Sequence, residues 1–306
     1  MKLATIGEDY ASRSIALVRE HDVVDVSGPM ATAGLGQRDL GEVLSAGPDA
    51  WMRLLDVARG ADNGHRGIPI ASVSFQVPVP RPQHVIAVAA NYRAHIEETG
   101  TIEFVPGTET NPWLFNKPQS SLNPHRAAVR LPRLLGERVD WEAELGVVIG
   151  QPAHDVPVEE ALTYVAGYTV VNDISARRMN VPSRTMTRPR DVFYDWLHGK
   201  WFDTFCCVGP WIVTPDEVAH PGELEITLDL NGKTMQRAST RDMIFPTEQL
   251  ISFISKIVTL MPGDIIATGT PAGVGKARNR FLQPGDTMTA SVEVVGSLTN
   301  SVVADE

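Results

Sequence analysis

The sequence is poor in cysteine and in long hydrophobic runs, and each shortage excludes a class of protein. Its 306 residues include only two cysteines, the neighbours Cys206 and Cys207, which argues against a disulfide framework and for a reducing compartment. No run approaches the roughly 18 apolar residues that a membrane-spanning helix needs. The first 20 residues carry charges that interrupt the apolar core expected of a signal peptide. We therefore expect a cytoplasmic protein that does not enter a membrane.

Positive charge is also in short supply. The chain has 27 lysines and arginines against 37 acidic residues, a formal net charge of -10. Nucleic acids and anionic membranes repel such a protein, so neither is an expected partner. Hydrophobic residues make up 43% and charged residues 21%, a balance typical of a globular chain and not of a disordered one.

A proline-rich stretch divides the chain. Residues 77–82 read VPVPRP, and alternating prolines remove backbone donors and keep a chain extended. We expect a small N-terminal domain over residues 1–80 and a larger domain over residues 81–306. Within the first domain, the sequence predicts short strands at 15–18 and 23–26 and a helix over 49–58, where apolar residues recur at helical spacing.

Beyond the prolines, patterns typical of β-strands dominate. Strands are predicted at 85–90, 144–150, 166–171, 208–214, 224–230, 264–268 and 287–295. The dipeptide Asn231-Gly232 predicts a tight hairpin, and the apolar residues of 246–260 share one side of a helix. Because these strands neither alternate with helices nor form a plain series, we expect the α+β class.

Three acidic residues stand at the ends of two apolar strands. In DWEAELGVVIG, Glu142 and Glu144 point to the same face because strand side chains alternate, and Asp173 ends the second strand. Adjacent carboxylates near a core repel each other, so they require a proton, arginines or a divalent cation. An all-oxygen set suits Mg²⁺ or Mn²⁺ better than zinc. The alternative is an edge strand on which both glutamates face water.

His95 and Glu98 follow the predicted strand at 85–90. They are three residues apart, so a helix would place them on one face. A carboxylate beside an imidazole raises its basicity and fixes its tautomer, as a general base that deprotonates water requires. The alternative is a solvated helix start with a surface histidine.

Polar residues also follow other apolar stretches. Lys117 and Lys200 lie near predicted strands, and Thr270 belongs to a loop of small residues at 268–275. Such a loop allows backbone N–H groups and the threonine hydroxyl to approach a ligand anion. Each of these residues could equally be structural, since lysines are usually solvated and glycines usually serve turns.

Taken together, these segments resemble the fumarylacetoacetate hydrolase family. The matching elements appear in the family's order: NYRAHIEE, LFNKP, DWEAELGVVIG, GYTVVNDISAR, GKWFDTFCCVGPW and GDIIATGTPAGVG. The resemblance is strongest to the bacterial branch of similar length that carries a small N-terminal domain. It implies a mixed β-roll or β-sandwich catalytic domain after a small α+β domain, a homodimer, and one Mg²⁺ or Mn²⁺ per subunit.

The resemblance also implies a role for individual residues. The metal ligands would be Glu142, Glu144 and Asp173. The catalytic residues would be His95, Glu98 and Lys200, with His95 and Glu98 activating water. The substrate-binding residues would be Tyr92, Lys117, Arg177, Asn180 and Thr270.

The activity implied by the resemblance is hydrolysis of the C–C bond of a 2,4-dioxo acid, of the acylpyruvate or fumarylpyruvate type, to pyruvate and a carboxylic acid. The substrate would be a small anionic oxo acid. Two alternatives use the same metal site: a decarboxylase of a β-keto acid such as oxaloacetate, and an isomerase or hydratase of an unsaturated 2-oxo-diacid. A third alternative, of another class, is a non-catalytic metabolite-binding protein.

One segment departs from the family. Relatives often have an Arg-Asp pair followed by Gln where this chain has Arg177, Arg178, Met179 and Asn180. Residues 173–200 hold six bases against three acids. We hypothesise that this segment covers the site and attracts a substrate with a second anionic group; the alternative is a salt-bridge loop between subunits.

Overall fold

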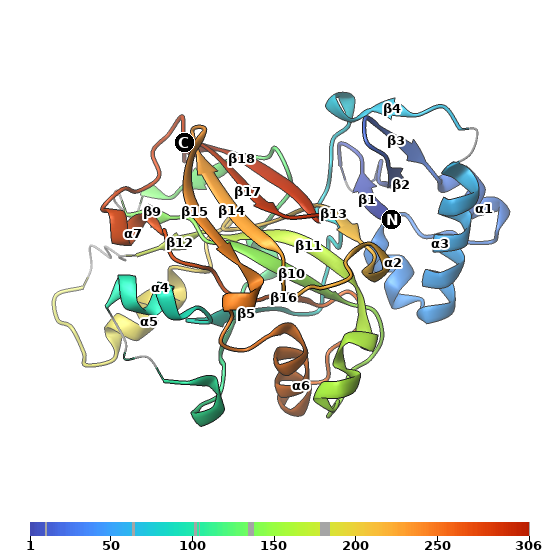
Figure 1. Ribbon diagram of the computed structural model, residues 1–306. Helices are drawn as coiled ribbons and strands as arrows, with labels where there is room; N and C mark the ends of the chain where they lie inside the picture. Colours follow the sequence, from blue (N-terminus) through green and yellow to red (C-terminus); the bar gives the residue numbers. More distant parts are fainter. Residues whose placement is uncertain are drawn as a thin grey trace.

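Two packed β-sheets with helices around them make up the computed structural model, which describes residues 1–9, 11–62, 65–100, 103, 105–133, 138–177 and 184–305 (Figure 1). The strands of the larger sheet are β1 (Lys2–Ile6), β2 (Ser14–Val18), β3 (Asp22–Asp25), β4 (Ile68–Pro69), β5 (Val85–Ala89), β6 (Trp113–Asn116), β7 (Leu122–Asn123), β10 (Ala143–Ile149), β11 (Val165–Asp173), β13 (Cys206–Val213) and β16 (Ile265–Ala267).

The remaining strands and helices complete the fold. The smaller sheet contains β8 (Val129–Leu131), β14 (Glu225–Leu230), β15 (Lys233–Ser239), β17 (Thr287–Val292) and β18 (Gly296–Ala304), and β9 (Val139–Asp140) pairs with β12 (Ser175–Ala176). The helices are α1 (Ser27–Thr32), α2 (Leu40–Ser45), α3 (Pro48–Asp62), α4 (Arg93–Thr99), α5 (Asp191–His198), α6 (Thr247–Ile257) and α7 (Gly275–Arg278). This mixture of sheets and helices confirms the expected α+β class.

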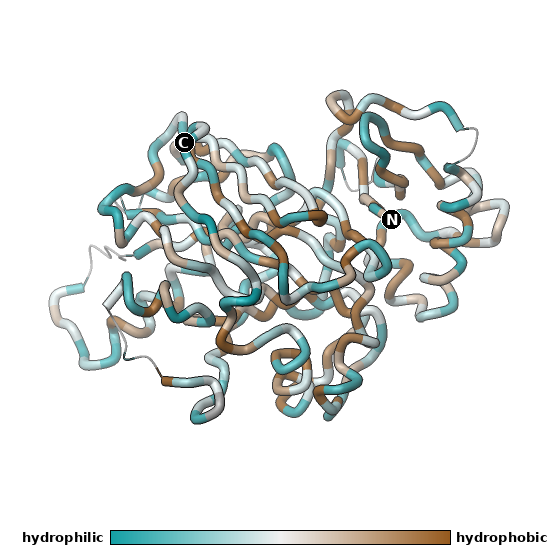
Figure 2. The backbone as a smooth tube through the Cα atoms, viewed as in Figure 1, coloured by the Kyte–Doolittle hydropathy of each residue, from teal (hydrophilic) through white to brown (hydrophobic). Residues whose placement is uncertain are grey.

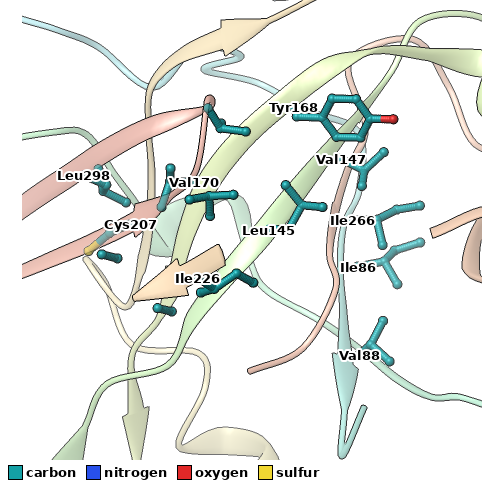
Figure 3. Packing of buried hydrophobic residues seen from close by; sticks show 14 of the residues in the cluster. Ile86, Val88, Leu145, Val147, Tyr168, Val170, Cys207, Ile226, Ile266 and Leu298 are labelled. Carbon is teal, nitrogen blue, oxygen red and sulfur yellow. The ribbon is translucent and has the colours of Figure 1, made fainter. Parts of the chain in front are cut away.

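The central strands are buried on both faces, which explains why they read as nearly continuous apolar runs. In β10, Leu145 and Val147 belong to a hydrophobic cluster that also contains Ile226 and Leu298 of the smaller sheet (Figure 3). Val148 of the same strand belongs instead to a cluster with apolar residues of α2 and α3. Figure 2 shows hydrophobic residues recurring along the central strands and hydrophilic segments mainly at the periphery.

The N-terminal elements extend the central sheet. β1 pairs antiparallel with β13, with Lys2 opposite Val213, so the larger sheet runs β4-β3-β2-β1-β13-β11-β10-β16-β5-β6. The first residues of the chain are therefore joined by backbone hydrogen bonds to the middle of the larger predicted domain. The boundary near residue 80 stays a prediction.

Local sequence signals located most of the other elements. Asn231 and Gly232 both have positive φ angles, 53° and 78°, as a tight hairpin between β14 and β15 requires. The helix predicted at 246–260 is α6. The strand predicted at 287–295 is wrong at its end: β17 stops at Val292, and Val294 takes a positive φ of 65° in the turn before β18. Apolar residues in that turn imitate a strand.

Two expectations from composition are also addressed by the fold. Cys206 and Cys207 are free and buried. Among the described residues, no helix is both long and apolar enough to cross a membrane.

Candidate metal centre and active site

Three buried carboxylates meet where β10 and β11 run side by side. Glu142, Glu144 and Asp173 each offer an oxygen within 4.8 Å of the others, and none is more than 5% exposed. The pairing of the two strands explains the meeting, because the Asp173 N–H donates to the Glu142 carbonyl at 2.8 Å. β10 lies between β11 and β16, so the alternative of a water-facing edge strand is wrong.

Three cations neutralise two of these carboxylates. Lys200 Nζ lies 2.5 Å from Glu142 Oε2 and 2.7 Å from Asp173 Oδ2. Lys117 Nζ lies 2.6 Å from Asp173 Oδ1, and a terminal nitrogen of Arg177 lies 2.6 Å from Glu142 Oε1. Burial opposes ionisation of Glu142, but Lys200 and Arg177 outweigh it and lower the pKa of that carboxyl.

Glu144 has a different environment. It accepts a hydrogen bond from the Gly269 N–H at 2.8 Å. Among the described residues it forms no salt bridge. Burial, followed by the negative charges of Asp173 and Glu142, raises its pKa well above the ordinary value. A crowded carboxylate in an all-oxygen set is chemically suited to a hard divalent cation. The residues present therefore fit the Mg²⁺ or Mn²⁺ that the sequence predicts.

The predicted dyad forms on α4. His95 Nδ1 lies 3.1 Å from Glu98 Oε1, and both side chains are largely buried, 13% and 19% exposed. Glu98 also accepts the Gly273 N–H at 2.8 Å, which fixes the carboxylate from its other side. His95 contributes to the lowered pKa of Glu142, so the dyad lies near the carboxylate cluster. The geometry allows the base role, which stays a prediction.

The other predicted substrate residues have mixed surroundings. Tyr92 is 1% exposed, and its hydroxyl has no hydrogen-bond partner in the described ranges. The Thr270 hydroxyl donates to the Ala143 carbonyl at 2.9 Å and accepts from Gln236 Nε2 at 2.8 Å. Asn180 lies outside the described residues.

The small-residue loop meets the protein's own groups. Gly269 donates to Glu144, Gly273 to Glu98 and Gly275 to Asp140. The expected approach of this loop to an anion is therefore seen with internal carboxylates. A local pattern of glycines cannot reveal which anion it will meet.

Sequence reasoning missed two buried polar residues that hold the site, Asn172 and Gln236, whereas it did place Asp140 near the two glutamates. Asn172 Oδ1 accepts the Glu142 N–H at 2.9 Å, and Gln236 Oε1 accepts the Ala143 N–H at 3.0 Å. Asp140 binds Arg177 Nε at 2.8 Å. The position of Asn172 beside Asp173 at a strand end was an available signal. Gln236 comes from the distant β15 and gave none.

The arginine-rich segment pairs with its own acids. Arg184 makes two hydrogen bonds to Asp195, at 2.6 and 2.7 Å, and Arg188 Nε lies 2.9 Å from Asp191. These pairs lie within one chain. Neither the positive entrance nor the inter-subunit loop is tested by them, and both stay predictions.

Comparison with known proteins now places the chain in a family. The model described as "Fumarylacetoacetate (FAA) hydrolase C-terminal" matches residues 84–303. The chain belongs to the fumarylacetoacetate hydrolase family. The resemblance drawn from its motifs is thereby confirmed, and so is the expected fold class.

Relatives in this family carry out more than one reaction. The chain is 40% identical over 268 residues to 2,4-didehydro-3-deoxy-L-rhamnonate hydrolase from Sphingomonas sp. (strain SKA58), covering 87% of this chain and 88% of the relative. It is 41% identical over 239 residues to mitochondrial oxaloacetate tautomerase from Rattus norvegicus, covering 77% and 71%.

A solved structure from the fumarylacetoacetate hydrolase family resembles the whole chain. Maleylpyruvate hydrolase from Sphingobium sp. SYK-6, in complex with manganese(II) ion and pyruvate, superimposes with a TM-score of 0.74 and 29% identity, covering 100% of both chains. That relative is thus seen with a divalent cation, for which this chain has a suitable acidic triad, and with a small oxo acid.

Proposed function

We propose that the protein is a divalent-metal-dependent hydrolase that cleaves the C–C bond of a 2,4-dioxo acid to pyruvate and a carboxylic acid. The observation that carries the proposal is the buried acidic triad beside a histidine–glutamate dyad. The relatives support it, because one hydrolyses a 2,4-didehydro-3-deoxy sugar acid and another is a maleylpyruvate hydrolase seen with manganese and pyruvate.

Glu142, Glu144 and Asp173 would hold the cation. A bound Mg²⁺ or Mn²⁺ supplies Lewis-acid stabilisation of the negative charge of an enolate. Lys117 and Lys200 form salt bridges with two of the carboxylates, since their ammonium groups lie within 2.7 Å of the acidic oxygens. Lys200 also brings positive charge to the centre where negative charge develops during the reaction.

His95 acts as the general base. Glu98 accepts a hydrogen bond from the Nδ1–H group, which leaves Nε2 free to take a proton from water. The water oxygen then bonds to C4 of the substrate, and the C3–C4 bond breaks. Its electron pair passes to the C3 side as the enolate of pyruvate, while the acyl part leaves as a carboxylic acid. The proton that His95 took from water then passes to C3, which completes the balance and regenerates the base.

Substrate contacts follow from the residues around the triad. Arg177 pairs with Glu142. Tyr92 lies near Glu144, and Thr270 donates to the Ala143 carbonyl. We propose that they bind the anionic oxo acid, together with Lys117 and with Asn180 from outside the described residues. The homodimer, the cytoplasmic location and the absence of nucleic-acid partners stay predictions.

A second candidate reaction uses oxaloacetate. The relative from Rattus norvegicus is an oxaloacetate tautomerase, and tautomerisation needs proton transfer at C3 but no attack by water. Decarboxylation of oxaloacetate also proceeds without an attacking water. These reactions would depend on the triad but less on His95 as an activator of water.

Turnover assays separate these reactions. We expect acylpyruvates to be hydrolysed, the activity to disappear with a chelator, and Mg²⁺ or Mn²⁺ to restore it. His95→Ala should lower hydrolysis by about 10²- to 10⁴-fold. The control is His154→Ala, because His154 is an exposed histidine that contacts Thr259.

The hydrolase proposal is wrong if no 2,4-dioxo acid is cleaved while oxaloacetate is tautomerised or decarboxylated by both the wild type and His95→Ala. Metal-dependent ligand binding without turnover of any oxo acid would favour the non-catalytic alternative.

A further inference from the structure

Four successive backbone N–H groups converge on two carboxylates. We call residues 273–276 the anchor segment. Gly273 donates to Glu98 at 2.8 and 3.0 Å, and the next N–H approaches Glu98 at 3.5 Å. Gly275 donates to Asp140 at 2.6 Å and Lys276 donates to Asp140 at 2.9 Å. The anchor segment therefore binds both Glu98 of the dyad and Asp140, which lies two positions before Glu142.

Asp140 is fully engaged by the protein. Its side chain is 0% exposed. Oδ1 accepts from the N–H groups of Trp141 and Gly275, and Oδ2 accepts from the N–H of Lys276 and from Arg177 Nε at 2.8 Å. An ionised carboxylate has about four acceptor sites, so these four bonds use its capacity. Asp140 thus cannot act as a ligand for metal or substrate without losing one of them.

Arg177 connects Asp140 to Glu142 through two hydrogen bonds. Its Nε binds Asp140, while its terminal nitrogen binds Glu142 Oε1 at 2.6 Å. The guanidinium is planar and rigid, so holding one edge on Asp140 fixes the direction of the other donor. The orientation of a metal-facing carboxylate therefore depends on a residue that does not touch the metal centre.

The anchor segment is packed closely against neighbouring backbone. Gly273 has a φ of +108°, and an added Cβ there would collide with the Met235 carbonyl oxygen of β15. A Cβ on Gly275 would collide with the Arg280 carbonyl oxygen. The Trp141 indole also donates to the Gly273 carbonyl at 3.2 Å. Asp140 and Glu98 therefore bind one closely packed segment of backbone, and loss of the Asp140 carboxylate removes the acceptor of two of its N–H groups.

We infer that Asp140 is a positioning residue that sets, through Arg177 and the anchor segment, the relative placement of Glu142 in the metal site and Glu98 in the dyad. The inference rests on the proposed function, because it requires the triad to bind a divalent cation. Asp140 is the first acid of DWEAELGVVIG. The inference gives it a role other than metal ligation or catalysis.

The direct test is calorimetric titration of Mn²⁺ into chelator-treated protein without substrate. Asp140→Asn keeps the shape of the side chain but places an NH₂ group against donors that the carboxylate now accepts. We expect its Kd for Mn²⁺ to rise by about 10- to 100-fold, the range found when residues supporting metal ligands are changed.

The matched control is Asp264→Asn. Asp264 is also 0% exposed and its oxygens accept backbone N–H groups, from His84 at 2.6 Å and Met261 at 2.8 Å, but none of these partners belongs to the candidate site. Both variants should lower the melting temperature. Only Asp140→Asn should weaken Mn²⁺ binding.

A double-mutant cycle tests the route. If Asp140 acts on Glu142 through Arg177, Asp140→Asn should change the Kd for Mn²⁺ by less than about twofold in an Arg177→Gln background. The link to the dyad is tested separately at saturating Mn²⁺, where kcat of Asp140→Asn for an acylpyruvate should stay about 10-fold below the wild type because Glu98 has lost its placement.

Should Asp140→Asn fail to fold, Lys276→Pro tests the same link. It removes one donor to Asp140 in the first turn of α7, where the N–H is not needed by the helix, and it should also weaken Mn²⁺ binding. The inference is overturned if folded Asp140→Asn binds Mn²⁺ with wild-type affinity. If Asp140→Asn does not fold, wild-type Mn²⁺ affinity in Lys276→Pro overturns it. Equal weakening of Mn²⁺ binding by Asp264→Asn also overturns it. Wild-type protein that binds no Mn²⁺ overturns the proposed metal site itself, and the inference with it.

Discussion

Two groups of buried charged side chains in this molecule have opposite arrangements. Near the N-terminus, Arg13 lies 3.0 Å from Asp39, and both side chains are at most 6% exposed. Asp39 also caps α2 by accepting the Glu42 N–H at 2.9 Å. This pair has one acid, one base and a backbone bond, so its charges balance and its role is structural.

At the ends of β10 and β11 the balance fails. Four acids face three bases there: Asp140, Glu142, Glu144 and Asp173 against Lys117, Arg177 and Lys200. The difference of one charge falls on Glu144, whose pKa is raised by burial and by its acidic neighbours. A buried carboxylate beside other acidic groups destabilises the fold unless a bound ligand compensates its negative charge. The comparison thus separates charge that supports structure from charge retained for function.

The largest expected effect comes from removing the excess acid. Glu144→Gln should weaken Mn²⁺ binding by at least about 100-fold and abolish hydrolysis. The metal-free variant should melt at the same temperature as the wild type or higher, because the amide relieves repulsion from Glu142 and Asp173 and can still accept the Gly269 N–H. Calorimetry and thermal melting measure both. Wild-type Mn²⁺ affinity in this variant would contradict the assignment.

Removing the acid of the balanced pair should do the reverse. Asp39→Asn should cost about 3 kcal/mol of stability, because it removes the carboxylate that faces the buried Arg13 while asparagine preserves the helix cap. Chemical denaturation measures the loss. Mn²⁺ affinity should stay at the wild-type value, and a large change in it would show that the two regions are coupled.

A partly buried histidine offers a third contrast. Burial, followed by the charge of Arg126, lowers the pKa of His125 from 6.5 to about 4, and its Nδ1 accepts the Thr299 N–H at 3.0 Å. Between those pH values the unfolded chain binds more protons, so stability should fall as pH falls, by at most about 3 kcal/mol.

The matched variant is His125→Asn, whose side-chain oxygen can replace Nδ1 as the acceptor. It should show a weaker loss of stability than the wild type when denaturation is repeated between pH 6.5 and 4. Identical pH profiles would show that His125 does not carry the effect.

The smallest effect is expected in the arginine-rich segment. Arg184 and Arg188 already pair with Asp195 and Asp191, so replacing both arginines by alanine should change KM for an acylpyruvate with a second carboxylate by less than about fivefold. Steady-state kinetics at two salt concentrations measure this. A larger, salt-sensitive rise in KM would favour the hypothesis of a positive entrance.

Local patterns predicted much of the catalytic region because short-range physics determines them. The alternation of β10 puts Glu142 and Glu144 on one face, and helical spacing puts His95 beside Glu98. Contacts between distant segments escaped prediction. Gln236 comes from β15 to hold the Ala143 N–H, and β1 joins β13 across more than 200 residues of chain.

The sequence by itself determined the α+β class, the family and the clustering of acids at strand ends, since periodicity and motif order are properties of neighbouring residues. Only the tertiary structure decided how each charge is compensated. It placed Lys200 between Glu142 and Asp173, left Glu144 without a cationic partner among the described residues, and directed the glycine loop to internal carboxylates. Compensation depends on distances of a few ångströms between segments far apart along the chain, which no local pattern encodes.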